Sequence, residues 1–164
     1  MTSFQTSRPT TDLSDAHPDK VRPVLQRFND YGAKRSFSGR IHTAVTAEDT
    51  RLIQEKLFTL QGNGGVIVVD GGGSLRTAML GDMMAERLIA NGWAGIVING
   101  AVRDSKRLAQ LDLGIKALGV TPVRSAKTGI GAIDVPVAFG SVLFEPGSYI
   151  YCDEDGILIA EEPL

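Results

Sequence analysis

The sequence is poor in the residues from which several kinds of site are built. It contains one cysteine and two histidines in 164 residues, and aromatic residues make up 6% of the chain. Cys152 alone cannot form an intrachain disulfide, and its neighbours supply no positive charge that would activate a thiol. His17 and His42 lie far apart without a cysteine or histidine companion, so we expect no zinc site. A reducing compartment, the cytoplasm, fits this composition.

An excess of positive charge is also missing, as is any long apolar run. The formal net charge is -2, and the scattered Lys and Arg residues form no basic stripe that could bind a nucleic-acid backbone. No apolar stretch approaches the roughly 18 residues of a membrane-spanning helix, and no signal-peptide pattern opens the chain. We therefore expect neither nucleic acid nor a membrane as a partner.

The remaining composition is that of a soluble α/β protein, with 43% hydrophobic residues and 19 glycines. Residues 1–10 are polar and predicted to be a flexible N-terminus, and residues 11–164 fit a single domain. Hydrophobic periodicity predicts layered sheets with helices packed on one side. The expected helices lie at 11–17, 47–60, 81–91 and 105–111, and the expected strands at 36–46, 66–69, 95–98, 114–120, 135–139, 142–144, 148–152 and 157–160.

A strand–helix–strand unit in the middle of the chain organises this prediction. The β-branched runs at 66–69 and 95–98 are typical of buried parallel strands, and their spacing of about thirty residues is that of a βαβ unit. The loops that follow such strands lie at the same edge of the sheet. We therefore expect Asp82, after the first strand, to lie close to Arg103 and Asp104, after the second.

Each of these residues has a functional and a plain interpretation. The backbone N–H groups at the helix start, from Gly81 through Asp82 and Met83 to Met84, could seat a carboxylate, although Asp82 could simply cap its own helix. Arg103 suits a carboxylate or carbonyl oxygen, and Asp104 is a hard oxygen ligand for Mg²⁺ or Mn²⁺. An Arg-Asp pair is more often a solvated ion pair of little energetic value.

Other candidates are weaker. Gly71-Gly72-Gly73 lacks the spacing of a nucleotide-binding loop and predicts a tight turn. Asp12 and Asp15 could cap a helix, contact a metal-bound water or face a partner, and the cap is favoured. Lys127 could line the site or be solvated. The run 153–156 lacks the ligand alternation of a calcium loop, so a hairpin turn is expected.

Several blocks of the sequence together resemble a known family. They are VVDGGGSLRTAMLGDMMAERL, GIVINGAVRDS, LDLGIKALGVTPVRSAKTGIG and FGSVLFEPGSYIYCDEDGILIA. In this order they resemble the family of regulator of ribonuclease E activity A (RraA) and the 4-hydroxy-4-methyl-2-oxoglutarate aldolases. The resemblance implies a swivelling β/β/α fold assembled as a homotrimer, or a dimer of trimers, with active sites between subunits.

The resemblance also implies an activity. The aldolase branch carries Asp, twenty intervening residues, then Arg-Asp, and Asp82, Arg103 and Asp104 fit this pattern. We therefore expect a lyase, a class II (metal-dependent) aldolase that cleaves its 2-oxo-acid substrate to two pyruvates and decarboxylates oxaloacetate through the same pyruvate enolate. Asp104 would hold the divalent metal, Arg103 would stabilise the enolate oxygen, and Asp82 would orient water.

The alternative expectation is a non-catalytic regulator that inhibits a ribonuclease by binding it. The inhibitor branch of the family has a non-acidic residue after the arginine, whereas this chain has Asp104. The acidic residue therefore favours catalysis.

Overall fold

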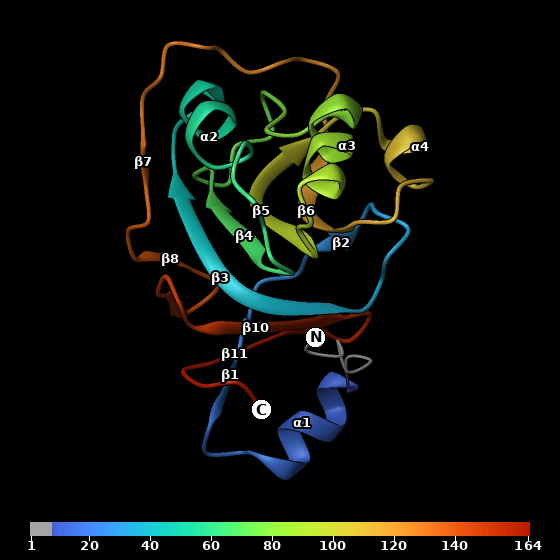
Figure 1. Ribbon diagram of the computed structural model, residues 1–164, viewed down its shortest axis with the longest axis vertical. Coiled ribbons are helices and arrows are strands. Elements are labelled where there is room, and N and C mark those ends of the chain that lie inside the picture. Colours follow the sequence, from blue (N-terminus) through green and yellow to red (C-terminus); the bar gives the residue numbers. More distant parts are fainter. Residues whose placement is uncertain (1–7) are drawn as a thin grey trace.

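Four parallel strands form the centre of the computed structural model, which describes residues 8–164 (Figure 1). Every residue of β5 is buried, as are the first four residues of β4. Both faces of these strands are covered, which explains their unbroken apolar sequence. In spatial order the parallel strands are β3 (Phe37–Val45), β4 (Val66–Asp70), β5 (Gly95–Val102) and β6 (Gly114–Val120).

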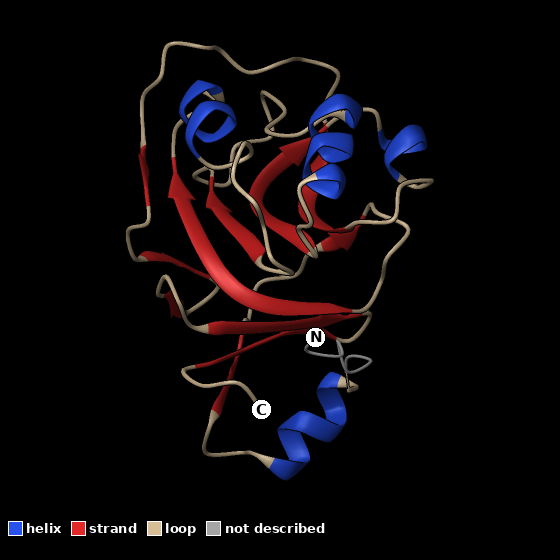
Figure 2. Ribbon diagram, viewed as in Figure 1, coloured by secondary structure: helices blue, strands red, loops and turns tan. Residues whose placement is uncertain are grey.

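One face of the parallel strands is covered by helices (Figure 2). They are α2 (Arg51–Lys56), α3 (Asp82–Ala90) and α4 (Ser105–Leu108). Side chains alternate along a strand, so Ile67 and Val69 of β4 pack into the core beneath these helices. Val66 and Val68 of the same strand pack into a second core on the opposite face. The expected layering of helices on one side of the sheet is confirmed here.

The second core lies between the parallel strands and the β-rich C-terminal half. Residues 37–40 of β3 pair antiparallel with β10, and residues 41–45 pair parallel with β4, so this curved strand belongs to both layers. The Phe37 ring occupies the space where side chains of Gly95 and Gly114 would lie, so both positions require glycine. The C-terminal strands are β8 (Val137–Phe139), β9 (Val142–Phe144), β10 (Tyr149–Asp153) and β11 (Gly156–Ala160).

Helix α1 (Thr10–Ala16) covers the outer face of the β10–β11 hairpin, opposite the other helices. The buried carboxylate of Asp153 holds it there, accepting hydrogen bonds of 2.7 Å from both the backbone N–H and the hydroxyl of Thr10. Burial alone would raise the pKa of Asp153, but the hydrogen bonds from Thr10 and the following turn outweigh it and lower that pKa. The run 153–156 is the expected hairpin turn.

The first ten residues are only partly described. Residues 1–7 of the segment expected to be flexible lie outside the described part of the chain, and Thr10 already belongs to α1. Asp12 lies in the first turn of this helix, although the residue that caps it is Pro9. None of the helices within 8–164 has the length and apolar character needed to cross a membrane.

Three short strands lie where the sequence predicts loop or a different strand boundary. Each has two or three residues and is held by a longer neighbour, so its own sequence is too short to show a period-two pattern. These strands are β1 (Val21–Pro23), which pairs with β11, β2 (Asn29–Asp30), which pairs with β6, and β7 (Ala132–Ile133), which pairs with β3.

The helix expected at 47–60 is shorter than predicted, because α2 begins only at Arg51 and the residue at its N-cap position is Thr50. Glu48 has a positive φ of 52°, and Asp49 is 1% exposed. The Asp49 carboxylate accepts hydrogen bonds from the backbone N–H groups of Arg51, Thr128 and Gly129 and from the Thr128 hydroxyl. Asp49 therefore stabilises the loop after β6 and does not belong to the helix.

We predict that Asp49→Asn destabilises the fold by about 2–3 kcal/mol at neutral pH, because a buried amide cannot replace a carboxylate that accepts from several donors. Burial alone would raise the Asp49 pKa, but its hydrogen bonds outweigh burial and hold it below the ordinary 3.8. The ionised group therefore stabilises the fold above that value, and the contribution is lost as pH falls through the lower folded-state pKa.

Urea unfolding of wild type and Asp49→Asn at about pH 7 and about pH 3 tests this. The difference between the two proteins should shrink at the lower pH. Asp112→Asn, at an exposed loop position, is the control and should match wild type at both. An equal Asp49→Asn deficit at both pH values would contradict the assignment.

Candidate active site

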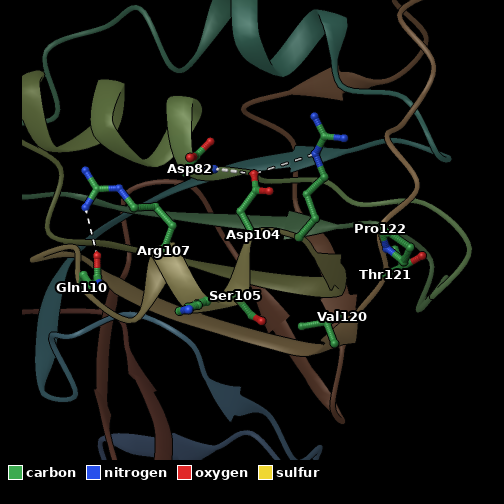
Figure 3. Close-up of a pocket in the computed structure, with 10 residues that line it drawn as sticks. Asp82, Asp104, Ser105, Arg107, Gln110, Val120, Thr121 and Pro122 are labelled. Carbon is green, nitrogen blue, oxygen red and sulfur yellow. Dashed lines mark hydrogen bonds and ion pairs between the residues drawn. The ribbon is translucent and has the colours of Figure 1, made fainter.

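Backbone pairing brings the loop before α3 against the end of β5. The Met79 N–H donates to the Ala101 carbonyl at 2.8 Å, and the Arg103 N–H donates to the Leu80 carbonyl at 2.9 Å. The start of α3 is thereby fixed beside the residues that follow β5. As the sequence predicts, Asp82, Arg103 and Asp104 converge, and all three line one pocket (Figure 3).

Asp104 has a left-handed backbone, with φ 59° and ψ 36°. This region is uncommon for residues other than glycine, although aspartate tolerates it better than most. Asp104 precedes α4, yet its side chain makes no capping hydrogen bond to that helix. Its Oδ2 instead accepts from the Asp82 N–H at 3.1 Å and lies 4.0 Å from Arg103 Nε. The strained turn thus directs the carboxylate across the pocket to α3.

Gly81 makes this arrangement possible. A Cβ at this position would lie 2.8 Å from Asp104 Oδ2 and 3.4 Å from Arg103 Nε. The backbone of Gly81 is extended, with φ −127°, so glycine is needed here for space and not for its conformational freedom. Its missing side chain allows Arg103 and Asp104 to lie against the start of α3.

Some of the backbone N–H donors at the start of α3 already have acceptors. The Asp82 N–H is bonded to Asp104, and the Met83 N–H donates to Asp82 Oδ1 at 2.8 Å. One Asp82 oxygen is thus engaged at its own helix start, although the residue at the N-cap position is Gly81. The N–H groups of Gly81 and Met84 have no hydrogen-bond acceptor within residues 8–164. Two of the four predicted donors thus remain open.

Arg103 and Asp104 are accessible from the pocket. Each side chain is 39% exposed. At 4.0 Å their contact is an ion pair too long for a hydrogen bond. The Arg103 side chain donates no hydrogen bond to any residue that the structure describes. Its fork of N–H donors is available for an anionic or carbonyl oxygen.

The pocket has a volume of about 710 Å³ and includes residues that the sequence reasoning missed. Thr121 and Pro122 follow β6, the next parallel strand, so the same sheet-edge argument applied once more would have found them. The adjacent cations Lys106 and Arg107, two residues after Asp104, were a second sequence signal for a larger pocket. The additional lining residues are Ser105, Lys106, Arg107, Gln110, Val120, Thr121 and Pro122.

The weaker candidates lie elsewhere. Lys127 is not among the residues that line this pocket. Gly71-Gly72-Gly73 form the expected tight turn, in which Gly72 and Gly73 have positive φ. Cys152 is buried, which raises the pKa of its thiol. His42 packs edge-on against Trp93 with ring centroids 5.0 Å apart, and burial lowers its pKa.

Comparison with known proteins identifies the family. The model of the RraA-like family, described as Aldolase/RraA, matches residues 10–159. The chain belongs to the RraA-like family. This agrees with the resemblance and with the observed β/β/α layers.

Similar members of the RraA-like family carry different names. A protein of Pseudomonas syringae pv. tomato named "Putative 4-hydroxy-4-methyl-2-oxoglutarate aldolase" is 50% identical over 155 residues, covering 94% of this chain and 95% of that protein. The RNA-processing inhibitor RraA of Thermus thermophilis is 44% identical, with a TM-score of 0.90 over 96% of this chain and 94% of that one.

A third similar protein, from Geobacillus kaustophilus HTA426, is named an S-adenosylmethionine:2-dimethylmenaquinone methyltransferase. Its structure has a TM-score of 0.93 and is 43% identical, covering 96% of this chain and 97% of that one. The names describe three activities on one RraA-like fold. Activity must therefore be argued from the site, because a shared fold hosts different functions.

We predict that Gly81→Ala displaces the Asp104 carboxylate while leaving the fold stable. The added methyl would meet a side-chain tip and not backbone, so the carboxylate moves and the bond to the Asp82 N–H breaks. A crystal structure should show this separation well beyond the present 3.1 Å.

Gly100→Ala is the matched control, because its methyl would meet its nearest neighbour at an ordinary 3.4 Å. Thermal unfolding of both variants should remain close to wild type. An unmoved Asp104 in the Gly81→Ala structure would show that Gly81 has another role.

Proposed function

We propose that this protein is a divalent-metal-dependent 4-hydroxy-4-methyl-2-oxoglutarate aldolase that also decarboxylates oxaloacetate. The observation that carries the proposal is the convergence of Asp82, Arg103 and Asp104 in one open pocket. Both reactions pass through the enolate of pyruvate, so they need the same groups: a cation and donors at the enolate oxygen, and a route for a proton.

The donor set fits a cation that keeps most of its water. Asp104 Oδ2 is engaged by the Asp82 N–H, whereas Oδ1 has no hydrogen-bond partner within the described chain. Residues 8–164 contain no group of three or more His, Cys, Asp or Glu side chains placed to hold a metal. One hard carboxylate oxygen suits Mg²⁺ or Mn²⁺, with water and substrate as the other ligands. When bound, the ion would polarise the 2-oxo group.

The residues of the chain then have distinct roles. Arg103 donates to the 2-oxo oxygen, and these hydrogen bonds strengthen as negative charge develops there. The open N–H groups of Gly81 and Met84 seat the adjacent carboxylate at the helix start. Asp82 keeps one oxygen free of the Met83 N–H and orients water for proton transfer.

The cleavage balances without a redox partner. The C4 hydroxyl gives its proton to water oriented by Asp82, the C3–C4 bond breaks, and C4 becomes the carbonyl carbon of one pyruvate. The electron pair of the broken bond passes to the C2 oxygen, which Arg103 stabilises. Protonation of C3 completes the second pyruvate. In oxaloacetate the bond from C3 to the leaving carboxylate breaks instead and releases CO₂.

Pyruvate release from oxaloacetate tests the proposal. It should require Mg²⁺ or Mn²⁺, stop on chelation, and be lost in Asp104→Ala. Arg103→Ala should lower the rate by about 10²- to 10³-fold, the cost of removing an oxyanion contact. The rate with metal ion alone is subtracted, and Asp112→Ala, outside the pocket, is the control. Wild-type activity in Asp104→Ala would refute the metal assignment.

The same preparation can test the alternative. The similarity to an RNA-processing inhibitor favours a regulator as the second candidate. Tight binding to a ribonuclease in a pull-down, together with no turnover of either 2-oxo acid, would replace the aldolase proposal with this one.

We further propose that the chain assembles as a homotrimer, or a dimer of trimers, whose subunits meet beside the pocket. Exposed apolar side chains surround this sheet edge, including Leu75 at 52%, Met83 at 80% and Val123 at 53%. Leu75 lies over the end of β6, where a Cβ added to Gly119 would be 3.3 Å from Leu75 Cδ2. Exposed apolar groups in one region are typical of surfaces that another subunit covers.

A charge placed in this surface should weaken the assembly. We predict that Leu75→Asp and Val123→Asp shift the mass in solution toward the monomer, because a carboxylate would be buried without a partner. Light scattering after size-exclusion chromatography measures this directly. Leu143→Asp, at an apolar residue that is 47% exposed on β9, is the control and should retain the wild-type mass. A monomeric wild type would refute the proposal.

A further inference from the structure

The pocket extends well beyond the three residues that handle the enolate. Arg107 and Gln110 lie on one side of Asp104, and Thr121 and Pro122 lie on the other (Figure 3). Its volume of about 710 Å³ is within the range of sites for ligands much larger than a three-carbon acid. The Arg107 end of the pocket is therefore open to the rest of a longer substrate.

The Arg107 end of the pocket has more cationic than anionic side chains. Two of the three lining cations, Lys106 and Arg107, lie at this end, where Arg107 is paired with Glu86, whereas Arg103 lies with Asp82 and Asp104. Both carboxylates lie at the end assigned to the enolate. The enolate end thus carries one cation beside two carboxylates, and the other end carries two cations beside the Glu86 carboxylate, an excess of positive charge that favours a substrate with a second negative charge.

Arg107 is held in place from two directions. One terminal nitrogen donates to Glu86 Oε1 of α3 at 2.8 Å, and the other lies 3.4 Å from Gln110 Oε1. The Arg107 and Glu86 side chains are 47% and 50% exposed. An ion pair this exposed stabilises a fold very little, so together with the Gln110 contact it favours this orientation of the guanidinium without fixing it. The guanidinium has five N–H donors, and these two contacts leave donors free for a carboxylate.

We propose that Arg107 is a specificity-determining residue that binds the distal carboxylate of a 2-oxo dicarboxylic acid. The inference rests on the proposed function in placing the 2-oxo group at Arg103. The planar fork of arginine matches a carboxylate edge, and a fork already oriented loses less entropy on binding. Selectivity for diacids then comes from α4, directly after the Arg103-Asp104 pair.

Binding of two ligands that differ only at the far end tests this without turnover. The probes are 2-oxoglutarate and 2-oxopentanoate, measured by titration calorimetry with Mg²⁺ present. Wild type should prefer the diacid, and Arg107→Met should reduce that preference by about 10- to 100-fold, as expected for hydrogen bonds to a charged group. Arg107→Lys should keep part of it. Arg87→Met, an exposed arginine of α3 outside the pocket, should keep all of it.

A second measurement separates this inference from the proposed function. Exchange of the pyruvate methyl protons with solvent deuterium needs only the enolate end, so Arg107→Met should exchange at the wild-type rate. If wild type does not catalyse exchange, the aldolase proposal fails, and the ligand preference still decides the role of Arg107. An unchanged diacid preference in Arg107→Met, or a parallel loss of 2-oxopentanoate binding, would overturn the inference.

Discussion

The parallel register of β3 to β6 is the constraint on which the rest of the molecule depends. Because these strands point the same way, the loops after β4, β5 and β6 all emerge at one edge of the sheet. Every polar group of the candidate site lies in those loops or in the helices that follow them. The buried valines and isoleucines of these strands carry no chemistry of their own, but their packing fixes where Asp82 and Asp104 meet.

The placement of side chains at that edge depends on two local features, one of backbone conformation and one of space. Asp104 is turned into the left-handed region, and Gly81 leaves room for its carboxylate. Each would be unfavourable or unnecessary in a structure selected for stability alone. The hydrogen bonds that the loop before α3 makes to the end of β5 hold both in place. The site is thus built on the sheet, and its strain is supported by neighbouring backbone hydrogen bonds.

The parts that could be predicted from sequence are those with a strong local signal. The runs around Val68 and Val97 have a buried-strand pattern, and the βαβ spacing then brings Asp82 to Asp104. The strand β2 could not be predicted, because its two residues acquire their structure only by pairing with β6. The short length of α2 could not be predicted for a similar reason. The sequence around Asp49 is typical of a helix start. Its carboxylate instead accepts a hydrogen bond from the Thr128 N–H, nearly eighty residues later. A local sequence pattern cannot indicate so distant a partner.

The distribution of charge in the pocket links this architecture to chemistry. Asp104 is the second residue after β5 and Asp82 is the first residue of α3, whereas Arg107 lies about one helical turn beyond Asp104 in α4. The spacing along the chain therefore becomes a spacing along the pocket, with the groups proposed for enolate formation at one end and Arg107 at the other. A monocarboxylic acid would use only the first end. The Arg107 guanidinium keeps donors beyond its contacts with Glu86 and Gln110, and these are the donors that the proposed second carboxylate of the substrate would meet.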